Sequence, residues 1–378
     1  MKPLIFLHTL DITLDGGVER VVCNMANYFI RHDYRVTILS TFQQNNRLKY
    51  DFDNRITFYY VFPHVSFDNW KKKNVFIKGQ LLQRYSISFS IARRIYKYID
   101  NNTCQSDKKV ILCNDYLHVP FYGHKNTTLI GIDHSRYPYG STRGFMHWLR
   151  TFYVHNALNI VTTLNPDEKG KWESLGRPVF VIPNFLPNNE ALKEHNDNRQ
   201  KTILSIGRMN TEQKGFDRLI DAYSLIAKKH QDWKLKIFGS GCFQKKYIDK
   251  VTELGLNQYI EIHDFTSDPF REYTNASIYA MCSRSEGFPM VLLEAGSCGL
   301  PIVSYDIEFG PRQIVKDGIT GYIVQNGDKQ LFASALENLI TNGDVRKKMS
   351  ESIEKDIAER YSEKVIMGEW EKIINGLY

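Results

Sequence analysis

Short β-rich apolar runs alternate with helical segments along this chain, and the alternation constrains the fold more than any other feature. Residues 4–7 and 35–39 have the composition of buried strands, and the intervening segment, 18–30, places its apolar residues on one helical face. Strands that alternate with helices are joined by crossovers and form mostly parallel sheets. The sequence therefore predicts an α/β fold. Further strands of the first half are predicted at 110–113, 128–132, 160–163 and 179–182.

A turn-rich segment at 183–189, Pro-Asn-Phe-Leu-Pro-Asn-Asn, interrupts this pattern, which restarts at Ile203. A chain of 378 residues also exceeds what one hydrophobic core usually organises. We therefore predict one domain at residues 1–185 and a second at 186–360. The strands predicted after the restart are 234–238, 259–262, 278–281 and 301–304.

The remaining segment, 361–378, is predicted to be helical. Its apolar residues Ile366, Trp370, Ile373 and Ile374 fall on one helical face. Such a stripe indicates a helix that packs against another part of the protein.

Six scattered cysteines, none of them in a Cys-x-x-Cys motif, provide neither a structural zinc site nor a disulfide framework. The N-terminal apolar run is too short for a signal peptide, and no window approaches 18 consecutive apolar residues. We therefore expect a cytoplasmic protein without a membrane-spanning segment.

The net charge of +7 is unevenly distributed. Residues 1–190 contain 24 Lys and Arg against 15 Asp and Glu, a net charge of +9, and the remainder has a net charge of −2. Basic and aromatic residues interleave at 69–98 and 136–153. Such segments either contact an anionic membrane surface or pack as ordinary amphipathic helices with Lys and Arg stems over apolar surface. Nucleic acid is not favoured as a partner, because no recognised nucleic-acid-binding module accompanies them.

The stretch at 283–296 contains two glutamates eight positions apart, Glu286 and Glu294, on either side of the start of an apolar helix. Pro289 favours the first turn of that helix, and the Gly-Leu-Pro at 299–301 favours its end. The first amides of such a helix are free to bind phosphate. Glu294 then lies about 7.5 Å along the axis from Pro289, roughly the distance from a diphosphate to a ribose. This arrangement suits a nucleotide-sugar.

A second polar cluster follows the apolar run that begins at Ile203. Gly207 ends this run, and the cations Arg208 and Lys214 follow in a loop. Loops at the carboxyl ends of parallel strands are where open α/β sheets bind ligands. Arg offers a planar fork to phosphate oxygens and Lys a point charge. We therefore predict that this loop binds the same diphosphate.

Together, the two clusters resemble those of glycosyltransferase family 4, whose members are retaining enzymes that use nucleotide-sugar donors. The resemblance extends over most of the chain. It implies the GT-B fold, in which two Rossmann-like domains with mostly parallel sheets face a central cleft. In this fold the N-terminal domain binds the acceptor and the C-terminal domain binds the nucleotide-sugar. The resemblance also implies that the C-terminal helix at 361–378 crosses back to the N-terminal domain.

The resemblance assigns roles to individual residues. Arg208 and Lys214 match the cations that bind the donor diphosphate. Glu286 matches the residue near the donor sugar, and Glu294 the one on the ribose. His134 matches a histidine that reaches the transferred sugar after a strand of the first domain. The implied catalytic residues are Glu286, His134, Arg208 and Lys214. The implied donor-binding residues are Gly16, Gly17, Arg208, Lys214, Gly239, Ser240, Phe265, Gly287, Phe288, Pro289, Met290, Val291 and Glu294.

Two positions limit what the resemblance implies. Many members have a glutamate where this chain has Gln313, so no catalytic role is predicted there. Asp51-Phe-Asp53 has the form of the acidic triplet of metal-dependent transferases, but it lies outside the phosphate clusters. Because the basic residues can neutralise the diphosphate, we predict a metal-independent enzyme without a cofactor.

These observations predict a retaining hexosyltransferase that transfers a hexose or N-acetylhexosamine to a growing surface glycan. The expected donor is a UDP-sugar, with a GDP-sugar as the alternative. The expected acceptor is a lipid-linked oligosaccharide, a polysaccharide or a lipopolysaccharide, and peripheral contact with the inner face of the membrane is expected through the basic first domain. The alternatives are a sugar-nucleotide 2-epimerase of GT-B-like fold and a non-catalytic binding subunit.

Overall fold

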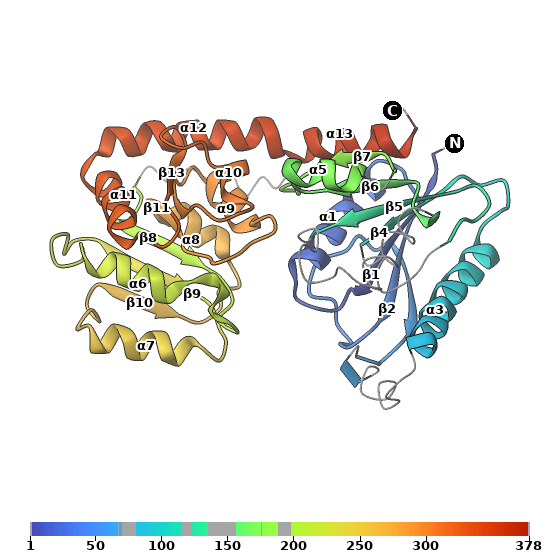
Figure 1. Cartoon of the computed structure of the whole chain (residues 1–378), viewed down its shortest axis with the longest axis horizontal. Coiled ribbons are helices and arrows are strands. Elements are labelled where there is room, and N and C mark those ends of the chain that lie inside the picture. Colours follow the sequence, from blue (N-terminus) through green and yellow to red (C-terminus); the bar gives the residue numbers. More distant parts are fainter. Residues whose placement is uncertain are drawn as a thin grey trace. The chain divides into compact units, whose positions relative to one another are not determined.

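Two parallel sheets, one in each half of the chain, organise the structure (Figure 1). The structure is a computed structural model that describes residues 2–66, 68–69, 81–114, 122–134, 156–174, 176–187 and 198–376, without the side chains of 81–88. The chain divides into unit 1, Met1–Asn184 with Ile366–Tyr378, and unit 2, Phe185–Val365. Most of the interleaved basic and aromatic residues predicted to contact a membrane, including all of 136–153, lie outside the described residues.

In the described part of unit 1, the sheet has seven strands in the order β3-β2-β1-β4-β5-β6-β7. Every neighbouring pair of these strands is parallel. The strand order reverses between β1 and β4, so the carboxyl ends of these two strands form a topological switch point. The strands are β1 Leu4–Asp11, β2 Val36–Phe42, β3 Thr57–Phe62, β4 Lys109–Cys113, β5 Thr127–Asp133, β6 Ile160–Thr163 and β7 Val179–Val181.

Helices α1, α3 and α5 pack against the sheet of unit 1. Helix α3 contributes Ile91, Ile95 and Ile99 to a core cluster that also contains Leu129 of β5 and Val161 of β6. The last helix, α13, buries the predicted apolar stripe: Ile366, Trp370, Ile373 and Ile374. The described helices of unit 1 are α1 Gly17–Arg31, α3 Leu81–Asn102, α5 Pro166–Glu173 and α13 Glu363–Ile374.

The described part of unit 2 contains a six-stranded sheet in the order β10-β9-β8-β11-β12-β13, again with parallel pairs throughout. Its strand order reverses between β8 and β11, which makes the carboxyl ends of these strands the second switch point. The strands are β8 Thr202–Ile206, β9 Lys234–Phe238, β10 Ile260–His263, β11 Ile278–Met281, β12 Ile302–Tyr305 and β13 Gly321–Val324.

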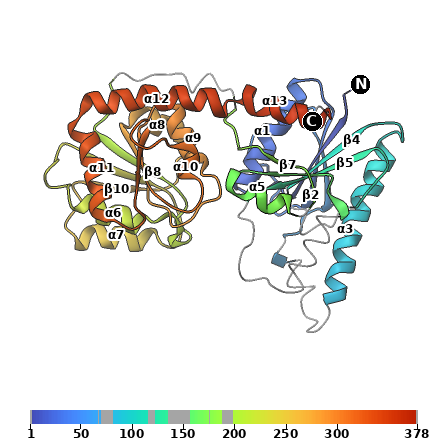
Figure 2. The same ribbon diagram turned by 45° about the horizontal axis from the view of Figure 1, so that its top comes forward.

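Helices cover the sheet of unit 2, and the long helix α12 packs against α9 (Figure 2). This approach is close, because a Cβ at Gly296 of α9 would lie 2.9 Å from Ile357 and 3.0 Å from Ile353 of α12. The helices of unit 2 in the described residues are η2 Glu212–Lys214, α6 Phe216–Ser224, α7 Gln244–Glu253, α8 Pro269–Asn275, α9 Met290–Ser297, α10 Pro311–Ile314, α11 Lys329–Thr341 and α12 Gly343–Tyr361.

The parallel α/β architecture predicted from the alternation is confirmed. Two strands were not predicted, β3 at the edge of its sheet and β13, which has four residues and begins with a glycine. Helix α9 begins one residue later than the predicted start, since Pro289 is its N-cap. No helix in the described part of the chain is both long and apolar enough to cross a membrane.

Candidate active site at the carboxyl edge of the second sheet

One of the two predicted phosphate-binding cations, Lys214, meets the first predicted glutamate, Glu286, at the switch point of unit 2. Lys214 lies in the loop after β8, and Glu286 lies in the loop after β11. Lys214 Nζ donates to Glu286 Oε1 at 2.7 Å. The hydroxyl of Ser283 donates to the same oxygen at 2.6 Å. The two motifs, 72 residues apart in sequence, therefore form one polar site.

Two glycines bring Lys214 to this position. Gly215, which follows it, has φ +67, a left-handed conformation that glycine adopts without strain. A Cβ at Gly215 would lie 1.9 Å from the backbone oxygen of Cys282, so this turn packs directly on the end of β11. The stem of Lys214 lies over Gly207, where a Cβ would be 3.1 Å from its Cγ.

A clasp of further polar contacts holds the two loops together. Arg284 forms two hydrogen bonds with the carboxylate of Asp217, at 2.9 and 2.6 Å. Gln213 donates its side-chain amide to the backbone oxygen of Ser285 at 2.8 Å. Burial opposes ionisation of Asp217, but the hydrogen bonds from Arg284 lower its pKa overall. The clasp is therefore charged at neutral pH, and it fixes the loop that carries Glu286.

The N-terminus of α9 faces this loop. The first amides of a helix have no intrahelical partner, so those of Met290 and Val291 are available to an anion. Gly310 packs against the start of the helix, with φ +101 and with Pro289 Cδ 2.5 Å from where a Cβ would lie. Any side chain at Gly310 would displace Pro289.

Glu294, the predicted ribose residue, is only 3% exposed. Its Oε2 accepts a hydrogen bond from the hydroxyl of Tyr273 at 2.9 Å. The contact with the ribose stays a prediction, and it requires that an oxygen of this buried carboxylate be reachable from the site.

Arg208 differs from Lys214 in its surroundings. It is exposed, and in the described part of the chain it has neither a hydrogen bond nor an ion pair. Without a ligand, Lys214 is therefore neutralised by Glu286, whereas Arg208 keeps its full charge and all its donors for an incoming anion.

The loops after β9 and β10 line the same sheet edge. A Cβ at Gly239 would lie 1.9 Å from the backbone oxygen of Gly207, so the loops after β8 and β9 are in backbone contact. Ser240 accepts a hydrogen bond from the amide of Phe265 at 3.0 Å. The side chain of Phe265 is 66% exposed, which leaves an aromatic face open at this edge.

The remaining predicted site residues lie in unit 1. Gly16 is the N-cap and Gly17 the first residue of α1, after the loop that follows β1, and Tyr50 donates to the backbone oxygen of Gly16 at 2.9 Å. No atom would lie within 4 Å of a Cβ at Gly17, so this part of the loop has open space beside it. His134 follows β5, and its Nε2 lies 2.5 Å from Oδ1 of Asn114, which follows β4. Both groups are at the carboxyl edge of the sheet of unit 1.

Asp53, from the predicted acidic triplet, forms two hydrogen bonds with the guanidinium of Arg55, at 2.9 and 2.8 Å. These bonds lower the pKa of the Asp53 carboxyl to about 2. Within the described residues, no group of three or more His, Cys, Asp and Glu side chains is arranged to bind a metal ion.

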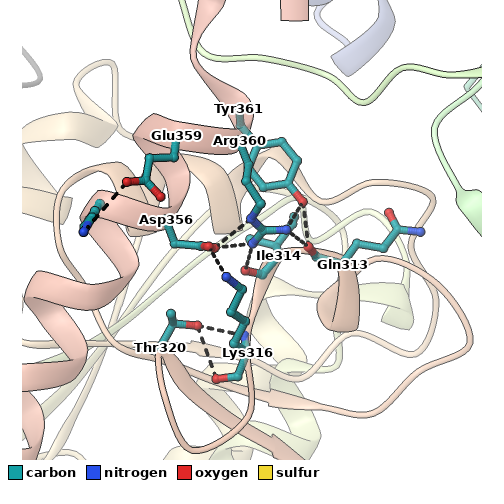
Figure 3. A network of polar contacts seen from close by, with 9 residues as sticks. Gln313, Ile314, Lys316, Thr320, Asp356, Glu359, Arg360 and Tyr361 are labelled. Carbon is teal, nitrogen blue, oxygen red and sulfur yellow. Dashed lines mark hydrogen bonds and ion pairs between the residues drawn. The ribbon is translucent and has the colours of Figure 1, made fainter. Parts of the chain in front are cut away.

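Gln313, which departs from the family pattern, belongs to the short helix α10, whose backbone is held by Arg360 of α12 (Figure 3). Arg360 donates to the backbone oxygens of Gln313 and Ile314 at 2.7 and 3.0 Å. Asp356 accepts from Lys316 at 2.5 Å and also binds Arg360. This network fixes the turn that begins with Gly310 and packs on Pro289.

Sequence reasoning missed several residues of the site. The clasp residues Arg284, Asp217 and Gln213 and the buried Tyr273 have no motif of their own, because their partners are distant in sequence. Ser283 lies three residues before Glu286 in a loop, a spacing that by itself predicts no hydrogen bond between the two side chains.

Comparison with known proteins finds similar glycosyltransferases. Residues 188–356, within unit 2, match the family Glycosyl transferases group 1. An uncharacterized glycosyltransferase of Haemophilus influenzae is 27% identical over 383 residues, covering 99% of this chain and 100% of that protein. The amylovoran biosynthesis glycosyltransferase AmsD of Erwinia amylovora is 24% identical over 380 residues, covering 96% of this chain and 97% of that protein.

Solved structures show the same fold. A variant of S. aureus TarM, in complex with fondaparinux, alpha-GlcNAc-glycerol and UDP, has a TM-score of 0.74 at 17% identity, covering 99% of this chain and 100% of that one. The family match within unit 2 and the full-length similarity to two glycosyltransferases indicate a glycosyltransferase, and its fold is the GT-B fold of the solved structures.

Proposed function

We propose that this chain is a retaining glycosyltransferase that transfers a hexose or an N-acetylhexosamine from a UDP-sugar to a growing surface glycan. The observation that carries the proposal is the site at the carboxyl ends of β8 and β11. There, an exposed Arg208, the Lys214–Glu286 pair and the start of α9 lie at one switch point.

This site has the charges that the reaction requires. Breaking a sugar–diphosphate bond leaves negative charge on the diphosphate and builds positive charge at the anomeric carbon. Arg208, Lys214 and the free amides at the start of α9 would stabilise the diphosphate. Glu286, in the loop before the helix, would face the sugar, and Glu294 would accept from the ribose.

We also propose that residues at the carboxyl edge of unit 1 bind the substrates. The open space beside Gly17 would admit a diphosphate, and Asn114 orients His134. A histidine in this position would donate a hydrogen bond to the transferred sugar. Attack of the acceptor from the face that the diphosphate leaves would give retention of configuration.

The names of similar proteins support the choice of substrates. The Erwinia protein is named for amylovoran biosynthesis, and the TarM structure contains UDP. We extend the same classes of acceptor and donor to this chain, with a GDP-sugar as the alternative donor. We propose a cytoplasmic location on the inner face of the membrane, because the charge of residues 1–190 favours an anionic surface.

We propose that the diphosphate is neutralised by the cations of this site without a metal ion. The test is activity with the matching donor in the presence of a chelator. Full activity is expected, and a loss that manganese restores would implicate Asp51 and Asp53 in metal binding.

A panel of UDP, GDP and ADP in a thermal-shift experiment tests the donor assignment. The matching nucleotide stabilises the folded protein by mass action, by about 2.7 kcal/mol at one hundred times its Kd. We expect the largest shift with UDP. The absence of a shift with every nucleotide would contradict the proposed function. Conversion of a UDP-sugar to its isomer without an acceptor would identify an epimerase instead.

A further inference from the structure

The two oxygens of the Glu286 carboxylate have different surroundings. Oε1 accepts two hydrogen bonds, from Lys214 and from Ser283, at 2.7 and 2.6 Å. Oε2 accepts none from the described residues. The side chain of Glu286 is 10% exposed, so the carboxylate is held at the edge of the protein interior. One oxygen is thus fixed by the protein, and the other is left for a ligand.

The two donors to Oε1 differ in mobility. Ser283 follows β11 and is only 1% exposed. The clasp between Arg284 and Asp217 holds the next residue of the loop, so the hydroxyl of Ser283 has a fixed position. Lys214 has a long flexible stem with three rotatable donors, and its side chain is 21% exposed. Lys214 can therefore turn to another anion, whereas Ser283 remains in place.

A diphosphate is a stronger partner for Lys214 than a single carboxylate, because it carries more negative charge. When Lys214 turns toward it, Glu286 loses one of its two donors. The remaining hydrogen bond, from Ser283, then decides the orientation of the carboxylate.

We propose that Ser283 is a positioning residue, which holds Oε1 of Glu286 so that Oε2 accepts a hydrogen bond from a hydroxyl of the donor sugar. This role rests on the proposed function of the site. No bond to the substrate is assigned to Ser283 itself; it acts through Glu286.

The loop contains a matched control for this role. Ser285 lies two residues after Ser283 in the same loop, and its backbone oxygen accepts from Gln213. In the described part of the chain its hydroxyl has no hydrogen-bond partner. Ser283→Ala and Ser285→Ala therefore remove the same group from one loop, and only the first removes a bond to Glu286.

The experiment measures affinity by calorimetry for UDP, UDP-glucose, UDP-N-acetylglucosamine, GDP and GDP-mannose. The wild type first identifies the nucleotide and the sugar that binds with it. We expect Ser283→Ala to weaken binding of the nucleotide-sugar about tenfold and binding of the free nucleotide less than twofold. Ser285→Ala is expected to change neither affinity.

A double-mutant cycle with Glu286→Gln separates positioning from a general effect on the fold. If Ser283 acts through Glu286, Ser283→Ala has little further effect on nucleotide-sugar affinity in the Glu286→Gln background. Additive losses, or equal losses for nucleotide and nucleotide-sugar, would overturn the inference and leave the proposed function standing. A wild type that binds no nucleotide would overturn the proposed donor site and the role of Ser283 with it. A wild type that binds nucleotide and nucleotide-sugar equally would overturn the role of Ser283 alone.

Discussion

The carboxyl edges of the two sheets have the same topology but different chemistry. In both sheets the strand order reverses beside the first strand of the unit, at β1 and β4 in unit 1 and at β8 and β11 in unit 2. The edge of unit 2 combines Lys214, Glu286 and an exposed Arg208. At the edge of unit 1, one buried carboxylate, Asp11, accepts from Thr13 and from the amide of Gln44.

The difference shows how one architecture supports two kinds of site. The fold decides where a ligand can bind, and the side chains in the loops decide which ligand it is. Mobile and exposed cations suit a diphosphate, as we propose for unit 2. The glycine loop of unit 1 offers open space beside Gly17 instead of a mobile cation, which suits the contact with the diphosphate that we propose for it.

Removal of both cations of unit 2 is expected to have the largest effect on activity. Arg208→Ala with Lys214→Ala removes two charge-assisted hydrogen bonds, worth together about 3–6 kcal/mol if they add. Sugar transfer from the matching donor should fall by about 10²–10⁴. The control is Lys201→Ala with Lys234→Ala, at the amino ends of β8 and β9, which should leave transfer unchanged. Near-normal transfer by Arg208→Ala with Lys214→Ala would contradict the proposal that the edge of unit 2 binds the diphosphate.

Asp356→Asn is expected to loosen the turn that supports the start of α9. The substitution leaves Lys316 and Arg360 without their shared carboxylate and should lower the free energy of unfolding by about 2–3 kcal/mol at pH 7. Burial opposes ionisation of Asp356, but its bonds to Arg360 and Lys316 lower its pKa overall.

The contribution of a carboxylate with a lowered pKa is complete above the pKa of the unfolded state, near 4, and is lost as the pH falls below it. The difference in unfolding free energy between the wild type and Asp356→Asn, measured in urea, should therefore shrink between about pH 5 and pH 3. A difference independent of pH would show that the charge of Asp356 does not stabilise the turn.

His134→Ala tests whether the carboxyl edge of the sheet of unit 1 takes part in catalysis. His134→Ala removes the imidazole that Asn114 orients, and we expect sugar transfer to fall about 10–100-fold because one hydrogen bond to the substrate is lost. Affinity for the free nucleotide should not change. His64→Asn, at an exposed loop of the same unit, is the control. A loss of nucleotide affinity in His134→Ala would assign the histidine to the diphosphate rather than the sugar.

Gly17→Ala is expected to have the smallest effect, and it should change stability and nucleotide affinity in opposite directions. A Cβ at Gly17 would meet no atom within 4 Å, and the residue begins a helix, so Gly17→Ala should raise the free energy of unfolding by about 0.5–1 kcal/mol. The added methyl group should weaken binding of the nucleotide a few-fold if the loop contacts the diphosphate. Unchanged affinity, measured by calorimetry, would remove Gly17 from the donor site.

The strand and loop pattern was sufficient to predict the parallel sheets and to bring Lys214 and Glu286 to one site. Each follows a strand end marked by an apolar run, and parallel strands end at the same edge of a sheet. The bond between them and the clasp of Arg284 with Asp217 join residues about 70 positions apart. Such pairs depend on how the turn at Gly215 packs on the end of β11, which no local pattern specifies.

The two strands that were not predicted differ in the signal that their sequences carry. Strand β3 lies at the edge of its sheet and is mostly partly exposed, but its aromatic and β-branched run Phe58–Phe62 favours a strand and was sufficient to predict one. Strand β13 begins with Gly321, where a Cβ would lie 2.1 Å from the backbone oxygen of Ile302. Close packing selects a glycine there, and glycine is a weak signal for a strand.

The most direct test of the central claim is a crystal structure of the protein with UDP. We predict that the two phosphates lie within hydrogen-bond distance of Arg208, Lys214 and the amides of Met290 and Val291, with Lys214 turned away from Glu286. A diphosphate bound at another part of the molecule, with the Lys214–Glu286 ion pair intact, would contradict the account.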